Sequence, residues 1–235
     1  SQRPLLLIGT PMCTAFSNIQ NLNKGKRDPA VVAAEIEKAR THLRWCCHLY
    51  KRQVERGAYF LHEHPSQATS WNTEEIREIM QLDGVSRVTA DQCQFGQESE
   101  QGEPIKKPTG WMSNSEDILE QLSMKCQGRR GMCSATSSPH AVCSGKTAKK
   151  AAEYAFAICK AILKGFHKHL QKTGRMSPGL NCVVPSSASC CPDSHIQQIC
   201  ENEDECIRIL SAILEHKGLG DIFDATTGQV LRGEL

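Results

Sequence analysis

Cys13 is the residue that this sequence marks most clearly for chemistry. It follows the apolar run 5–8, which predicts a short buried strand, and a Gly-Thr-Pro sequence that ends that strand. In open α/β sheets, ligands bind where strands end in such turns. A cysteine at this place can act as a nucleophile if its neighbours favour the thiolate. Free cysteine is also a common small core residue, and that interpretation stays open.

A carboxylate follows a second predicted strand, at 58–65. Glu63 lies there between His62 and His64, and Pro65 closes the strand. Alternation along a strand places the two histidines on one face and Glu63 on the other. The histidines could form a metal pair or a proton relay, or they could have a structural role beside the turn.

The segment between the two strands predicts a long helix over 28–56. Apolar residues recur there at spacings of three and four, Asp28-Pro29 is a typical start, and Gly57 is a typical end. Strand, helix and strand predict a right-handed βαβ unit with parallel strands. Cys13 and Glu63 would then project from the same edge of one sheet, as a candidate active site.

These segments, in this order, resemble cytosine-C5 DNA methyltransferases. The family carries a Pro-Cys loop followed by Phe-Ser, which residues 11–17 match with Met12 inserted before the cysteine. It also carries a strand ending in Glu-Asn-Val, which residues 60–64 match with His64 in place of Asn. By this resemblance, Cys13 would attack C6 of a flipped-out cytosine, and Glu63 would hydrogen-bond its Watson–Crick edge and assist protonation at N3. Substrate-binding roles would fall to Pro11, Phe16, Ser17, His64, Lys106 and Lys107, although the two lysines could equally be solvated loop charges.

The resemblance also implies what accompanies this site. In the family, the Gly-rich S-adenosylmethionine loop precedes the cysteine loop, and this chain begins only a few residues before that point. We therefore expect the catalytic-loop half of such an enzyme without its cofactor half, so that its activity is uncertain. The alternative is a non-catalytic segment that binds nucleic acid or a partner.

Later segments indicate an origin. The methyltransferase-like region of copia-type retrotransposon polyproteins of dinoflagellates is similar to residues 91–96, 102–109, 126–128, 151–154 and 162–165. Residues 223–231 resemble its linker to the reverse transcriptase. The implied partners are DNA and the rest of the retroelement polyprotein. The expected location is intracellular, and nuclear if the protein acts on DNA.

Composition limits these expectations. Of the 235 residues, 39% are hydrophobic and 5% aromatic, which is low for a fully globular chain. The net charge of +2 gives no general field for nucleic acid, so DNA contacts would depend on local lysine clusters. No apolar run approaches transmembrane length, and we expect no membrane partner.

Thirteen cysteines, an odd number without a secretory signal, argue for reduced thiols or metal ligands rather than a disulfide scaffold. The best metal candidate is the set Cys126, Cys133, His140 and Cys143, spaced Cys-x6-Cys-x6-His-x2-Cys. Tetrahedral zinc accepts three thiolates and an imidazole, and it would order this Gly/Ser-rich loop. The usual Cys-x2-Cys pair is missing, and free thiols in a surface loop are the alternative.

The predicted fold class is α/β, with a partial Rossmann-like, methyltransferase-type parallel sheet, helices, and a helical, partly disordered C-terminal region. We expect a methyltransferase-like segment over 1–112, a helical region with the Cys/His loop over 113–171, a flexible linker over 172–195, and a C-terminal helix and tail over 196–235. Further helices are predicted at 73–82, 115–125 and 146–171, and a strand at 85–90.

Overall fold

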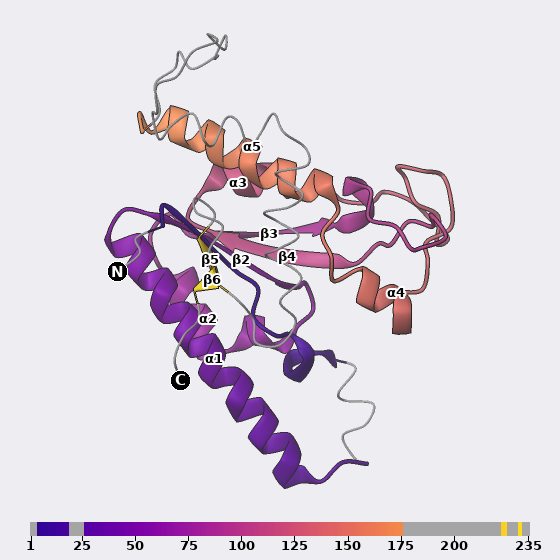
Figure 1. Ribbon diagram of the computed structural model, residues 1–235, viewed down its shortest axis with the longest axis horizontal. Coiled ribbons are helices and arrows are strands. Elements are labelled where there is room, and N and C mark those ends of the chain that lie inside the picture. The colour runs from indigo at the N-terminus through magenta and orange to yellow at the C-terminus, as the bar shows by residue number, and fades with distance from the viewer. Residues whose placement is uncertain (1–3, 19–25, 176–221, 225–229, 232–235) are drawn as a thin grey trace.

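A mixed sheet forms the centre of the protein in the computed structural model, which describes residues 4–18, 26–175, 222–224 and 230–231 (Figure 1). The strands are β1 (Leu6–Gly9), β2 (Tyr59–Pro65), β3 (Ser86–Asp91), β4 (Pro108–Ser113), β5 (Ile222–Asp224) and β6 (Val230–Leu231). The helices are α1 (Pro29–Glu55), α2 (Glu74–Met80), α3 (Glu116–Gln121), α4 (Gly145–Lys150) and α5 (Phe156–Lys172). The short 3-10 helices are η1 (Thr14–Phe16), η3 (Thr69–Asn72) and η4 (Gln92–Phe95).

The strand order is β3-β4-β2-β1-β5-β6. β1 and β2 are parallel, as the βαβ prediction requires, and every other neighbouring pair is antiparallel. The α/β fold class is therefore confirmed, with one parallel pair at the centre of a mixed sheet.

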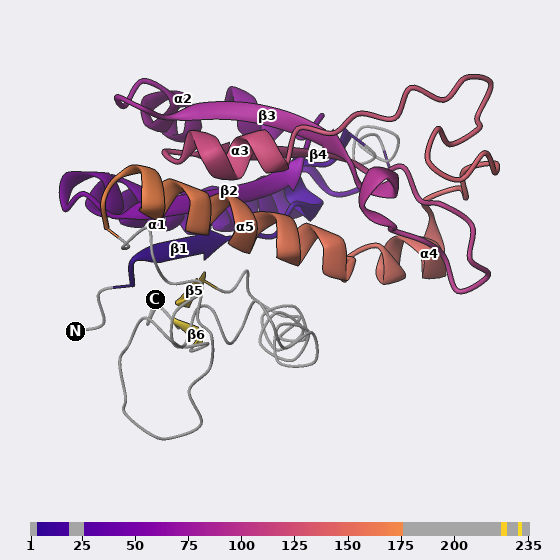
Figure 2. The same cartoon turned by 90° about the horizontal axis from the view of Figure 1, so that it is seen from above.

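Helices cover both faces of the sheet. α1 and α2 lie on one face, and α3 and α5 lie on the other (Figures 1 and 2). Along β1, Leu6 and Ile8 pack into the core beneath α3 and α5, while Leu7 packs into the core beneath α1 and α2. Because both faces are covered, the strand is apolar throughout instead of alternating with polar residues.

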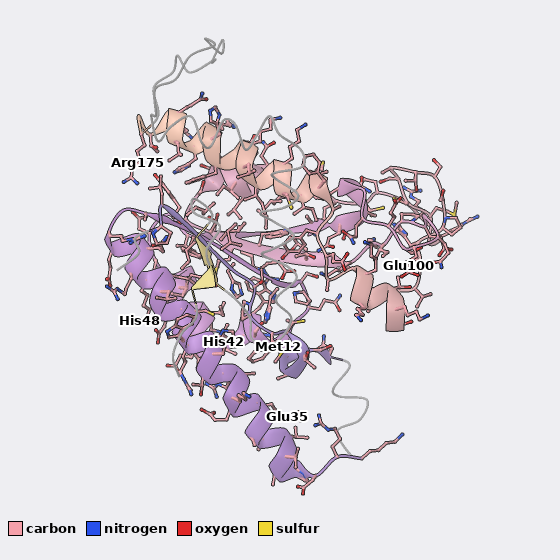
Figure 3. The ribbon with its side chains drawn as sticks, viewed as in Figure 1. Met12, Glu35, His42, His48, Glu100 and Arg175 are labelled. Carbon is pink, nitrogen blue, oxygen red and sulfur yellow. The ribbon has the colours of Figure 1, made fainter. Side chains whose placement is uncertain are left out.

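α1 occupies nearly the whole of the predicted range 28–56. The Asp28 side chain caps its first turn by accepting a hydrogen bond from the Ala30 amide (2.8 Å), and the chain leaves the helix at Gly57 with φ +67°. Its N-terminal end, which carries Glu35, projects beyond the sheet (Figure 3). Neither α1 nor any other helix of the described residues combines the length and apolar character needed to cross a bilayer.

The helix predicted over 146–171 is wrong in one respect, because residues 151–155 separate α4 from α5. Tertiary hydrogen bonds stabilise this break. The Ala151 carbonyl accepts from Lys107 Nζ (2.8 Å), and the Ala155 amide donates to the Gln97 side chain (2.9 Å). The helices predicted at 73–82 and 115–125 are α2 and α3, the latter shorter than expected, and the strand predicted at 85–90 is β3.

The remaining C-terminal predictions fall largely outside the described residues. This applies to the flexible linker beyond residue 175 and to the C-terminal helix from 196. From the tail, the structure describes β5, which pairs with β1, and β6, which pairs with β5.

α3 and α5 approach closely at Gly165. A Cβ added there would lie 2.6 Å from both the Asp117 carbonyl oxygen and the Ile118 Cα. Both atoms belong to the backbone, so the clash can be relieved only if one helix moves away from the other.

We predict that Gly165→Ala destabilises the protein by about 2 kcal/mol, because overpacking outweighs the better helix propensity of alanine. Urea unfolding measures this change. The control is Lys164→Ala on the exposed side of the same helix, which should leave the unfolding midpoint almost unchanged. An equal or greater stability of Gly165→Ala would contradict the close helix contact.

Candidate functional site

Parallel pairing places the cysteine loop beside the end of β2. Gly9, the last residue of β1, is in register with His62, the residue before Glu63. The close approach needs glycine, because a Cβ at position 9 would lie 1.9 Å from the Tyr50 hydroxyl oxygen. The chain then turns through Pro11 and the exposed Met12 to Cys13 at the start of η1 (Figure 3).

Cys13 is half-buried and lies within electrostatic reach of Glu63. Burial raises the pKa of the Cys13 thiol, and the Glu63 carboxylate raises it further, while Lys107 lowers it in part. The thiol form is therefore favoured in this structure. The structure thus brings together the two residues that the sequence predicted as catalytic.

Glu63 is a buried carboxyl group with an incomplete set of partners. Its side chain accepts a hydrogen bond from the Tyr154 hydroxyl, but its Oε1 atom is buried without a partner. Burial raises the pKa of Glu63, and Lys107 and Tyr154 offset this only in part. The carboxyl group can therefore hold a proton more readily than an exposed glutamate.

Lys107 and Tyr154 complete the surroundings of this pair. Lys107 has an unusual φ of +23°, and its Nζ atom lies 5.8 Å from the centre of the Tyr154 ring. Tyr154 also packs against Trp111, with ring centres 5.6 Å apart. Lys106, the other predicted lysine, accepts a hydrogen bond through its backbone carbonyl from the Gln92 amide (2.8 Å). The sequence predicted a continuous helix through Tyr154, and the helical pattern does not indicate that this residue bonds to Glu63.

His64 holds the cysteine loop in place. Its Nε2 donates to the Pro11 carbonyl (3.0 Å), so its Nδ1 is the acceptor for the Ser70 hydroxyl (2.5 Å). Burial lowers the pKa of His64 to about 4, although its backbone hydrogen bonds act in the opposite direction. A neutral imidazole with both nitrogens engaged supports the structural role rather than the metal pair or the proton relay.

The neighbouring predicted residues support the same loop. The Phe16 ring packs against His64, with ring centres 5.8 Å apart, and its carbonyl accepts from the Thr69 hydroxyl (3.2 Å). Ser17 ends η1, and its amide donates to the Thr14 carbonyl (3.2 Å). The buried His62 ring lies beside His64, with ring centres 5.4 Å apart, and bonds through Nδ1 to the Tyr50 hydroxyl (3.0 Å).

A second cluster lies beyond the end of β3, beside the first residue of β4. The ligand atoms of Cys93, Cys126, Cys133 and His140 all lie within 4.8 Å of one another and could hold a metal ion. Three of these residues belong to the predicted set, but the fourth predicted ligand, Cys143, is wrong because it is exposed and lies outside the cluster. Cys93 from η4 takes its place, and only the tertiary fold brings it there.

Within this cluster, the Cys126 thiol is more acidic than an ordinary cysteine. Burial raises its pKa, but hydrogen bonds from the amide and hydroxyl of Ser134 and from Gly128 outweigh this and lower the pKa to about 6. The eight cysteines of the described residues are present as thiols rather than as disulfides.

We predict that Glu63→Gln lowers the pKa of Cys13, because it removes a neighbouring negative charge. The pH midpoint of Cys13 alkylation by iodoacetamide, followed by mass spectrometry of its peptide, should move down. Lys107→Met should move it up. Cys143 in the same samples serves as the internal control, with one profile in all three proteins. If the Cys13 midpoint moved in neither variant, Glu63 and Lys107 would not influence the pKa of Cys13, and the prediction would be contradicted.

A second prediction concerns acid stability. Unfolded His64 would bind a proton below about pH 6.5, whereas the folded residue resists protonation until about pH 4, so stability falls as the pH drops through this range. The contribution is about 2 kcal/mol at pH 5. Urea unfolding at pH 7 and pH 5 should therefore show a smaller loss for His64→Asn than for the wild type. Exposed His48→Asn is the control and should retain the wild-type difference, and an equal loss in His64→Asn would refute the role of His64.

Comparison with known proteins gives no match. No family model, no curated protein and no solved structure is significantly similar to this chain. The site is therefore characterised by its own geometry, in which a thiol and a carboxyl group from two parallel strands share one environment.

Proposed function

We propose that this chain carries the base-binding, nucleophilic part of a cytosine-C5 DNA methyltransferase-like protein from a copia-type retrotransposon polyprotein. The observation that carries the proposal is the convergence of Cys13 and Glu63, which lie far apart in sequence, at one edge of the sheet. The unpartnered Oε1 of Glu63 supports it further, because a base edge would supply the missing hydrogen bond.

The residue types suit addition to a pyrimidine. Cys13 loses its proton to solvent, and its sulfur forms a bond to C6 as the C5=C6 double bond opens. The raised pKa of Glu63 lets its carboxyl group supply a proton to N3, and Lys107 then lies close to the carboxylate that remains. Covalent addition is what makes C5 of an aromatic base nucleophilic enough for a methyl group.

Two cofactors accompany this proposal. The described residues show no Gly-rich strand–turn–helix element for S-adenosylmethionine, so the chemistry proposed for them ends with the addition step. The methyl donor would bind to a cofactor half elsewhere in the complete protein. Zinc is the ion proposed for the Cys93–Cys126–Cys133–His140 cluster, whose donor set suits it.

A non-catalytic segment that binds nucleic acid or a partner is the second candidate. Two observations favour it. The pKa of Cys13 is raised, and Tyr154 already occupies a hydrogen-bonding position of Glu63. Tyr154 would have to move before a base could bond to both oxygens of the carboxyl group.

Covalent trapping distinguishes the two candidates. We predict that the complete protein, with S-adenosylmethionine and a duplex containing 5-fluorocytosine, forms a denaturation-resistant adduct, because fluorine at C5 prevents the elimination that would release the base. Cys13→Ser should abolish the adduct and leave duplex binding nearly unchanged, since phosphate contacts provide most of the affinity. Cys143→Ser is the matched cysteine control and should form the adduct normally. A wild-type protein that binds the duplex without forming an adduct would favour the non-catalytic segment.

A further inference from the structure

The Cys3His cluster has no role in the chemistry proposed for Cys13 and Glu63. The irregular chain segment 123–144, which carries three of the four residues, lies at the end of the sheet where α4 is found (Figure 2). We infer that Cys93, Cys126, Cys133 and His140 form a closed, four-ligand structural zinc site that folds the loop 123–144 onto η4. This inference does not depend on the methyltransferase proposal.

The loop 123–144 lacks a hydrophobic core of its own. It contains no helix or strand, and an isolated bridge between Met132 and Pro139 is its one β-pairing. Its buried residues are Cys126 and Cys133, which with Cys93 form a separate cluster. Irregular loops of this length are uncommon in compact domains, and burying small thiols does little to offset the entropy of ordering one. Metal binding would supply the missing free energy.

The distances fit a tetrahedral ion. Zinc binds sulfur at about 2.3 Å and nitrogen at about 2.0 Å, which places a thiolate and an imidazole ligand about 3.5 Å apart. Cys126 Sγ and His140 Nε2 are 3.6 Å apart. All four ligand atoms lie within 4.8 Å of one another, so small side-chain rotations would bring the rest to a common centre.

His140 is oriented as a metal ligand. Its Nδ1 lies 2.9 Å from the Gly131 carbonyl oxygen, which can only accept, so Nδ1 carries the proton. The lone pair of the neutral ring is then on Nε2, the atom that faces Cys126. A backbone carbonyl bound to the other nitrogen is the usual support of a histidine that binds metal.

The sulfur atoms also have the supporting donors that thiolates require. Gln94 Nε2 donates to Cys93 Sγ (3.5 Å) and to Cys133 Sγ (3.7 Å). The Ser134 amide donates to Cys126 Sγ (3.4 Å). Four protein ligands leave no position open for water or substrate, which is typical of structural rather than catalytic zinc. A disulfide would use only two of the three thiols and leave the third without a partner.

Metal analysis of paired variants tests the site. The full chain, expressed with zinc and dialysed, should lose one equivalent of zinc in Cys93→Ser relative to the wild type. Cys143→Ser, which removes the nearby exposed cysteine, should lose none. Comparing the two removes the contribution of any zinc held by cysteines elsewhere in the chain. Equal zinc contents in the two variants, or a wild-type protein without bound zinc, would overturn the inference.

A spectroscopic measurement covers the case in which Cys93→Ser fails to fold. Zinc X-ray absorption is recorded on the wild-type chain and on His140→Ala. The wild-type spectrum should contain a component with three sulfur ligands and one nitrogen ligand that is lost in the variant. A lost component with oxygen ligands, or no lost component at all, would contradict the assignment. Because neither measurement involves DNA or Cys13, failure of the zinc site and failure of the proposed function are separate results.

Discussion

The parallel pairing of β1 with β2 is the constraint on which the candidate site depends. Parallel strands end at the same edge of a sheet, and here the register sets Gly9 opposite His62. A shift by one residue would turn Glu63 to the face that the histidines occupy. The absence of a side chain at Gly9 lets β1 lie against Tyr50, whose hydroxyl also binds His62. This contact therefore lets the end of β1, from which the cysteine loop starts, lie close to α1.

The burial of Glu63 gives this edge its chemical character. A carboxylate placed among apolar residues costs free energy unless it is paired or protonated, and Glu63 is only partly compensated by Lys107 and Tyr154. On the opposite face of β2, His62 bonds to Tyr50, and His64 bonds to Ser70 and to the Pro11 carbonyl of the cysteine loop. Burial raises the pKa of both Glu63 and Cys13, and the charge on Glu63 raises the pKa of Cys13 further. The protonation state of one group therefore affects that of the other.

Local patterns in the sequence predicted the elements of this site but not its surroundings. The strand–helix–strand unit and the bounds of α1 follow from periodicity, Asp28 and Gly57, all of which act within a few residues. The helix break at 151–155 depends on a hydrogen bond donated by Lys107 and another accepted by Gln97, and both residues are distant in sequence. For the same reason, spacing selected Cys143 as a ligand, because it contains no information on a long-range partner such as Cys93. Tyr154 was missed because a helical pattern does not show where a helix is interrupted.

A crystal structure of the complete protein with a duplex containing 5-fluorocytosine would test directly whether Cys13 and Glu63 bind one base together. We expect continuous density from Cys13 Sγ to C6 of a flipped base, with the Glu63 carboxyl group hydrogen-bonded to the Watson–Crick edge of that base. Tyr154 should be displaced from the carboxyl group. A base bound elsewhere, with the Tyr154–Glu63 hydrogen bond intact, would contradict this expectation.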